Sequence, residues 1–387
     1  MSECAYRIRV EAPYQELSEA YFWFHPYLAA VPRGGGQGPS VVLLTQKHLV
    51  ADDHCSGSYL LRTDDLGATW RGPVEVPSLG WEEEAGYHRS VASLVPNWHP
   101  PTGRVLAIGH SCLYDPEGRI VDRPGATRVY YAVYDPEREV WSGLRVLQEP
   151  PPGYHGAASG CSQWLVEADG TVLLPAYVQE HGGTPWEVIV WRCTFDGERL
   201  ACVQPGSRLA RPDGRGLHEP SLTRYGGRYL LTIRSDDGAF ASASDDGLRY
   251  GSLQPWTFDD GAPLGSYNTQ QHWVTHSGGL FLAYTRRGAA NDHIFRHRAP
   301  VFIAAVDPVR LAVVRASERV LLPERGAPMG NFGAAPVTER ETWVTVGENM
   351  WNYGSYPPTS RGARGAILVA RILWERPNGL VATARCR

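Results

Sequence analysis

Short apolar runs recur along the chain, and turns rich in glycine, proline or aspartate separate them. The run VLAIGH (105–110) follows a turn glycine, and comparable runs are YLLTIR (229–234) and LFLAYT (280–285). Runs of this length with these boundaries are typical of β-strands rather than helices. The pattern therefore predicts an all-β fold built from many short strands.

The predicted strands repeat in groups of four. The clearest group, residues 86–148, reads as a four-stranded antiparallel meander with one long loop from Asp115 to Ala126. Radial repetition of such sheets leaves only short, protected edges. The sequence thus predicts a β-propeller that forms a single domain over residues 1–387. Six blades can be drawn, with room for a seventh, at roughly 20–77, 86–148, 156–210, 214–257, 266–323 and 328–385. The terminal segments YRIRV (6–10) and LVATARC (380–386) are available to close the ring.

Composition narrows the function classes. The chain has 42 Gly, 30 Pro, 20% charged residues and a formal charge of −4, without a Lys/Arg run that would indicate a nucleic-acid partner. No stretch approaches the roughly 20 apolar residues of a membrane span, and the start MSECAYRIRV lacks the features of a secretion signal, which predicts a cytoplasmic protein. The seven cysteines show no C-x-x-C spacing, so neither a disulfide framework nor a zinc site is indicated. We expect no cofactor and no metal site, although the spacing does not decide about a divalent cation on the propeller axis.

Two turns orient the predicted blades. TDDLGATW (63–70) and ASDDGLRY (243–250) approximate the Asp-box, S-x-D-x-G-x-T-W, which joins the third and fourth strands of blades in sialidase-like propellers. We expect Asp65 and Asp245 to accept hydrogen bonds from turn amides. Such turns lie on the face opposite the ligand, so these residues are predicted to be structural.

The opposite face should then receive the ends of the second strands and the starts of the first strands. Buried polar groups without partners are costly, so polar residues at one repeated position favour a shared site. His99, in a first-to-second-strand turn, is predicted to lie on the structural face. The segment 284–300 adds a cationic loop, which suggests an anionic ligand. The residues predicted on the ligand face are His110, Tyr177, Arg234, Arg286 and Glu348 from second strands, His25, His88, Gln163, His218, Glu219, Gln271 and His272 from first strands, and His293 from the cationic loop.

Several segments together resemble one family. These are WFHPY, HPPTGRVLAIGHS, HEPSL, SDDGLRY, GSYNTQQHW and YTRRGAANDHIFRHRAP. They are similar to the sialidase-superfamily propellers that include ulvan lyases, L-rhamnosyl-glucuronate lyases and a related α-L-rhamnosidase. The resemblance implies proton transfer by His110 and Tyr177, a uronate held by Arg192 or Arg234, and a second histidine at His88. True sialidases fit the sequence less well, because neither an F/Y-R-I-P motif nor four or five Asp-boxes is found.

The expected function is therefore cleavage of a rhamnose–uronic acid linkage in an anionic oligosaccharide by β-elimination. In that reaction an arginine neutralises the carboxylate, a histidine removes a proton and a tyrosine protonates the leaving group. Two alternatives stay open. One is an exo-acting α-L-rhamnosidase-type hydrolase, in which His25 is the residue of interest and Glu219 and Glu348 are the available carboxylates. The other is a glycan-binding propeller without catalysis.

Overall fold

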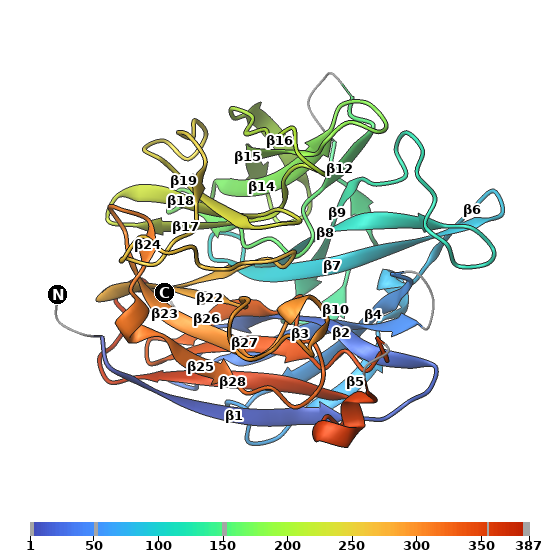
Figure 1. Cartoon of the computed structure of the whole chain (residues 1–387). Helices are drawn as coiled ribbons and strands as arrows, with labels where there is room; N and C mark the ends of the chain where they lie inside the picture. Colours follow the sequence, from blue (N-terminus) through green and yellow to red (C-terminus); the bar gives the residue numbers. More distant parts are fainter. Residues whose placement is uncertain (1–3, 50–52, 149–152, 354–355, 382–387) are drawn as a thin grey trace.

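The ring of sheets predicted from the strand repeats is present. The computed structural model describes residues 4–49, 53–148, 153–353 and 356–381, whose regular structure is almost entirely β-strand (Figure 1). The strands form six antiparallel sheets, which are the blades of a six-bladed β-propeller. The few helical segments in these ranges are single 3₁₀ turns, and none is long or apolar enough to cross a bilayer. Of the two blade counts that the sequence allowed, six is confirmed.

Blades 1 to 3 follow one another along the chain, each with its innermost strand first. Blade 1 consists of β2 (Tyr21–Val31), β3 (Ser40–Leu49), β4 (Cys55–Thr63) and β5 (Arg71–Glu75). Blade 2 consists of β7 (Tyr87–His99), β8 (Arg104–Tyr114), β9 (Val129–Asp135), β10 (Val140–Trp141) and β11 (Arg145–Val146), with β6 (Glu82–Glu84) paired to β7. Blade 3 consists of β12 (Gly156–Ala158), β13 (Leu165–Val166), β14 (Val172–Gln179), β15 (Glu187–Phe195) and β16 (Leu200–Pro205).

Blades 4 to 6 complete the ring. Blade 4 consists of β17 (His218–Tyr225), β18 (Arg228–Arg234), β19 (Ala239–Ser244) and β20 (Gln254–Pro255). Blade 5 consists of β21 (His272–His276), β22 (Gly279–Tyr284), β23 (Val301–Asp307), β24 (Ala312–Val313) and β25 (Arg319–Leu322). Blade 6 consists of β26 (Gly333–Thr338), β27 (Glu341–Gly347), β28 (Ala366–Trp374) and β1 (Tyr6–Gln15).

The N-terminal strand closes the ring. β1 pairs with β28 from Tyr6 opposite Trp374 to Gln15 opposite Ala366, so the two ends of the chain share one blade. The predicted closing strand YRIRV is therefore confirmed. In the other predicted segment, Leu380 and Val381 are not in a strand, and residues 382–386 lie outside the described residues.

The apolar core is divided among the spaces between blades. Large clusters of buried side chains each span two neighbouring blades, as where Trp191 of blade 3 meets Leu106 of blade 2. Burial of apolar surface is the main stabilising contribution to folding. Because the blades bury their faces against each other, the ends of the innermost strands are left for polar groups.

The two Asp-box turns are structural, as predicted, but one aspartate was assigned wrongly. Asp65 accepts hydrogen bonds from the Thr63 hydroxyl at 2.8 Å and the Thr69 N–H at 2.9 Å. In the second turn Asp246, not Asp245, accepts bonds from two backbone N–H groups, at 2.9 and 2.8 Å. The second turn has no counterpart of Leu66 between its aspartate and its glycine. Ser244 and Asp246 therefore correspond to Thr63 and Asp65 of the first turn. The side chain of Asp245 is 96% exposed.

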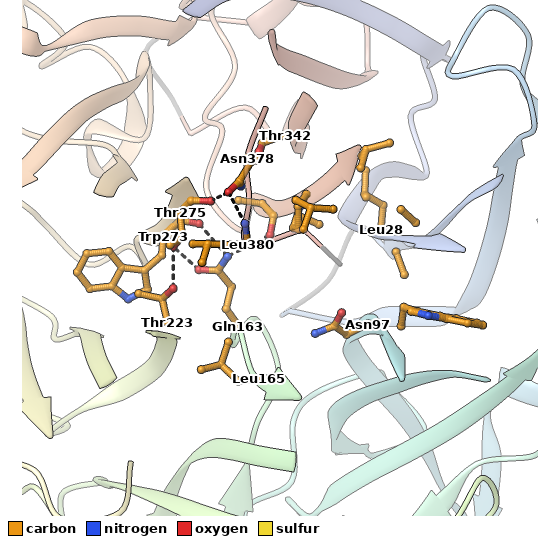
Figure 2. Close-up of a pocket in the computed structure, with 18 of the residues that line it drawn as sticks. Leu28, Asn97, Gln163, Leu165, Thr223, Trp273, Thr275, Thr342, Asn378 and Leu380 are labelled. Carbon is orange, nitrogen blue, oxygen red and sulfur yellow. Dashed lines mark hydrogen bonds between the residues drawn. The ribbon is translucent and has the colours of Figure 1, made fainter. Parts of the chain in front are cut away.

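The turns between first and second strands meet on one face. They border a cavity of about 1060 Å³ that also reaches the walls of the axis near Gln163 and Trp273 (Figure 2). Asn378, in the segment after β28, lies on this face and donates a hydrogen bond to the Thr275 carbonyl at 2.9 Å (Figure 2). We call this the lower face, and the opposite one the upper face.

Candidate functional site

The innermost strands share an unusual backbone feature at their upper ends. At or just before its innermost strand, each blade has a non-glycine residue in the left-handed region. Register shifts mark β-bulges at this point in blades 1, 2 and 4. Bulges re-aim side chains, and left-handed non-glycine residues cluster at functional sites. The six residues, with φ in parentheses, are His25 (54°), Ser93 (57°), Cys161 (60°), Glu219 (44°), Asn268 (47°) and Asn331 (60°).

Hydrogen bonds join several of these residues across the axis. The Asn331 Nδ2 atom donates to His25 Nε2 at 3.1 Å and contacts Cys161 Sγ at 3.4 Å. The Cys161 thiol donates to the Ser93 hydroxyl at 3.2 Å. Burial raises the pKa of Cys161 to about 12, so this thiol stays protonated and unreactive. Blades 1, 2, 3 and 6 are thereby connected at one level.

Two arginines complete this level from blade 4 and from the cationic loop. Arg234, the last residue of β18, donates to Glu219 Oε2 at 2.6 Å and to Asn268 Oδ1. Arg298 donates to the Asn268 carbonyl at 2.7 Å and to Asn331 Oδ1 at 3.3 Å. Both arginines are 7% exposed. Within the described residues, the Nε atoms of both are buried and lack a hydrogen-bond partner.

Within the described part of the chain, positive charge exceeds negative charge in the buried part of this cluster. Arg234 and Arg298 share one buried carboxylate, Glu219, whose pKa lies below its ordinary value because Arg234 outweighs the effect of burial. Burial, together with Arg234 and Arg296, lowers the pKa of Arg298 to about 9. A buried cation with an unused donor is stabilised by an anion, and guanidinium groups match carboxylates in particular. The upper axis is therefore suited to bind an anionic group.

An aromatic wall borders the arginines on the side of blades 2 to 4. The ring of His110 lies 6.1 Å from that of Tyr177, which lies 5.5 Å from that of His218. These three residues were predicted to meet, and they do. However, the strands do not end where the sequence suggested, because β8 continues four residues beyond His110. Burial raises the pKa of Tyr177 well above its ordinary value, so its hydroxyl stays protonated.

The protonation of His110 is fixed by the backbone of blade 3. The Gly160 N–H donates to His110 Nδ1 at 3.1 Å, so this nitrogen carries the lone pair. Burial lowers the pKa of His110 to about 4, so the ring is neutral at pH 7 and its proton sits on Nε2. His110 therefore presents an N–H donor to the site, not a free base.

A carboxylate that the sequence did not indicate lies at the edge of this site. The Asp53 Oδ1 atom is 3.4 Å from His48 Nε2, and the Arg298 charge further lowers the pKa of Asp53, to about 2. The His48 Nδ1 atom is 2.9 Å from the Leu49 carbonyl, which can only accept, so Nδ1 carries a proton. Nε2 is the ring nitrogen that faces the Asp53 carboxylate. Nothing in the sequence around Asp53 distinguishes it from other aspartates.

Tyr353 is a second residue that the sequence did not indicate. Its ring stacks on Phe295 at 3.8 Å with an interplanar angle of 2°. The Asn349 amide donates to its hydroxyl at 2.8 Å, which leaves the phenolic proton free to be transferred. Burial raises the pKa of Tyr353, while Asn349 and Arg298 oppose this effect. Tyr353 lies in the loop after β27, where no alternation of apolar and polar residues predicts the direction of a side chain. Only the tertiary fold brings it close to the arginines.

Arg286 and Glu348 were predicted at this site and lie elsewhere. Arg286 is two residues beyond β22, where it pairs with Glu318 at 2.6 Å and contacts the Phe302 ring. Glu348 accepts hydrogen bonds from the Arg364 and Ala366 N–H groups at 2.8 and 3.0 Å. Arg234 is the last residue of its strand, whereas Arg286 and Glu348 lie one or two residues beyond theirs, and their side chains turn into their own blades.

Three glutamine and histidine predictions are also corrected. Gln163 donates to the Trp273 and Ala334 carbonyls, both at 3.0 Å, and borders the lower cavity (Figure 2). His272 bonds to the Ser221 hydroxyl at 3.0 Å, and Gln271 bonds to Thr232 at 3.1 Å, both within the structural core. The neighbouring Gln270 faces the site instead. With its amide oriented so that both nitrogen and oxygen have hydrogen-bond partners, the nitrogen donates to Glu219 at 3.1 Å. The chain is irregular before β21, so alternation could not identify it.

Of the remaining predicted residues, two lie at the rim of the upper face and two lie away from the site. His88 lies at the upper rim against His54, and His293 pairs with Glu324 at 3.5 Å beside a cavity of about 210 Å³ that Tyr353 also lines. Arg192 bonds to Gln204 at 3.1 Å within blade 3, below the level of the site. His99 bonds to the Gly170 carbonyl at 2.9 Å in a lower turn, as its structural assignment predicted.

Comparisons with known proteins bear on the fold. No protein-family model and no curated protein matches the chain. A Dyadobacter fermentans protein of unknown function has a similar structure, with a TM-score of 0.64 and 14% identity over 95% of this chain and 99% of its own. Trypanosoma rangeli sialidase gives 0.60 and 11% over 91% of this chain, and NanB sialidase from Streptococcus pneumoniae gives 0.61 and 11% over 94%. The chain corresponds to 55% of the first sialidase and 70% of the second. It has the sialidase propeller fold, although its sequence had fitted true sialidases less well.

Proposed function

We propose that this protein is a glycoside hydrolase that removes an acidic sugar from a glycan. The observation that carries the proposal is the pair of buried arginines, Arg234 and Arg298. Among the described residues Glu219 is the one carboxylate that pairs with Arg234, and the Nε atoms of both arginines are buried without a hydrogen-bond partner. A sugar carboxylate would supply the missing partner. The solved sialidases include complexes with sialic acid and with 2,3-difluoro-KDN, both acidic sugars, which supports this assignment.

The groups around the arginines suit hydrolysis through a tyrosine. Sialidases differ from most glycosidases in using a tyrosine nucleophile. Here the Tyr353 oxygen would attack the anomeric carbon while Glu219 takes the phenolic proton, and Arg298 would stabilise the developing phenolate. A proton held between His48 Nε2 and the Asp53 carboxylate would pass to the departing oxygen. Water would then attack the anomeric carbon and break its bond to the Tyr353 oxygen. The His48–Asp53 pair would accept the proton from this water, and Glu219 would return its proton to the Tyr353 oxygen.

β-Elimination at a rhamnose–uronate linkage is the second candidate. It is favoured by the 6.1 Å separation of the His110 and Tyr177 rings beside Arg234, which matches the roles that the family resemblance implies. The proton on His110 Nε2 counts against it, because the base must accept a proton at that atom. In the hydrolase, His110 would instead donate a hydrogen bond to the sugar.

A substrate panel tests the proposal. Aryl glycosides of sialic acid, KDN and glucuronic acid are compared with aryl glycosides of neutral hexoses, and a rhamnosyl-glucuronide is followed by the ultraviolet absorbance of an unsaturated uronate. We expect release of an acidic sugar without that absorbance. Replacing Arg234 with Ala should abolish turnover, whereas Arg104→Ala, which removes a lower-face ion pair with Asp135, should not. Formation of the unsaturated product would instead support the lyase.

A further inference from the structure

Four rings form a stack on the upper rim between blades 1 and 2. The His54 ring lies 4.5 Å from Tyr114, 4.9 Å from His88 and 5.3 Å from Trp81, and the Trp81 ring lies 4.4 Å from that of His88. The two imidazoles also share a hydrogen bond between their Nε2 atoms at 2.7 Å. None of these four side chains has a role in the proposed hydrolysis.

The stack is closed at one end and open at the other. Tyr114 is fully buried and His54 is 8% exposed, whereas Trp81 is 43% exposed. Gly118 covers the inner end so tightly that a Cβ there would lie 2.6 Å from His54 Nδ1. Trp81 is fixed, because its indole N–H donates to the Cys55 carbonyl at 2.9 Å. A rigid indole with an open surface is a preformed contact for a ligand.

The stack is held in a set position relative to the proposed proton donor. The Tyr114 hydroxyl donates to the Asp53 carbonyl at 2.9 Å, and His54 is the next residue in the chain. Trp81 directly precedes β6, and the β6–β7 hairpin extends beyond the ring at the right of Figure 1. Trp81 therefore stacks on the residue that directly follows Asp53 in the chain.

The charges beside Trp81 select what can bind there. Glu82 and Glu83 follow it and are exposed, while Glu84 is paired with Arg89 at 2.5 Å and with Arg123 at 2.7 Å. Glu82 also accepts a hydrogen bond from the Tyr130 hydroxyl at 3.3 Å. Exposed carboxylates repel an acidic sugar but accept hydrogen bonds from hydroxyl groups. A neutral pyranose has both the hydroxyl groups and a face of C–H groups that can lie on an indole.

We propose that Trp81, supported by His54 and His88, is the platform that binds the neutral sugar to which the acidic sugar is linked. The inference rests on the proposed hydrolase and extends it. The substrate class would be an acidic sugar on a neutral sugar, with opposite charge preferences on the two sides of the cleaved bond.

Two substrates that differ only in the leaving group test the platform. For the acidic sugar identified in the panel, the lactose conjugate is compared with the methyl glycoside, using Trp81→Ala, Trp81→Phe and, as a control that removes exposed apolar surface elsewhere, Val74→Ala. We expect Trp81→Ala to lower kcat/KM about five- to tenfold for the lactose conjugate, mainly through KM. The methyl glycoside should be little affected, Trp81→Phe should restore most of the loss, and Val74→Ala should change neither.

A binding measurement keeps this test separate from catalysis. Lactose is titrated into the ¹⁵N-labelled protein, and the Trp81 indole N–H signal is identified by its loss in Trp81→Phe. Movement of this signal supports the platform even if no substrate in the panel is cleaved, a result that would overturn the hydrolase alone. Equal losses on both substrates, or an indole signal that does not move, would overturn the platform.

Discussion

The backbone N–H of Gly160 donates to His110 Nδ1 at 3.1 Å, so an atom of blade 3 decides which nitrogen of a blade 2 histidine carries the proton. A Cβ on residue 160 would lie 2.1 Å from that same nitrogen, so only glycine permits the contact. The histidine that resembled a catalytic base in the sequence is thereby presented as a hydrogen-bond donor.

His110→Gln should separate the two roles. A glutamine amide can still donate a hydrogen bond, so the hydrolase should keep turnover within roughly tenfold of the wild type. Loss of a base would lower turnover by about 10² to 10⁴. Steady-state kinetics and thermal melting on one preparation give the answer, and a large fall in turnover with an unchanged melt would restore His110 as the base.

Arg298→Met should raise stability while it removes activity. The Arg298 cation is destabilised by burial and by its neighbours, as its pKa of about 9 shows, and a buried cation can often be replaced by an apolar residue without loss of stability. Denaturant unfolding at pH 7 should give an unchanged or higher free energy of unfolding. A clearly destabilised variant would contradict the charge imbalance.

Acid should destabilise the fold before its carboxylates are protonated. Burial lowers the pKa of His25 and His272 to about 3 and of His110 and His218 to about 4. Below about pH 6.5 the unfolded chain binds protons that the folded chain excludes. The free energy of unfolding should therefore fall between pH 6.5 and 4, by up to about 1.4 kcal/mol per pH unit for each histidine. His272→Gln should flatten this part of the curve, and an unchanged slope would mean that His272 is protonated in the folded state.

The corrected Asp-box predicts a difference between adjacent residues. Asp246→Ala leaves two turn N–H groups without their acceptor and should destabilise by about 1 kcal/mol. Asp245→Ala should stay within about 0.5 kcal/mol. Chemical denaturation measures both, and neither variant should change the turnover of the folded enzyme. Equal effects would indicate that the turn uses both aspartates.

The strand repeats were enough to predict the propeller, because each blade is a local meander. Four short apolar runs separated by turns define one antiparallel sheet, and six of them must close into a ring to bury their faces. The same local information placed His110, Tyr177, His218, Glu219 and Arg234 on the ligand face, since they lie near the upper ends of first or second strands.

Which residues complete the site was decided only by the tertiary structure, although the sequence had indicated the cationic loop at 284–300 that supplies Arg298. Arg298, Asp53 and Tyr353 lie outside regular strands, where neither alternation nor strand ends predict a direction. Arg286 and Glu348 show the converse: one or two residues past a strand end, side chains turn into neighbouring ion pairs instead of the axis. The sequence alone determined which strands form blades 1 to 5, because the strands of each of these blades are consecutive in the chain. The site depends on six left-handed residues and two arginines from different blades, whose contacts exist only after the ring has closed.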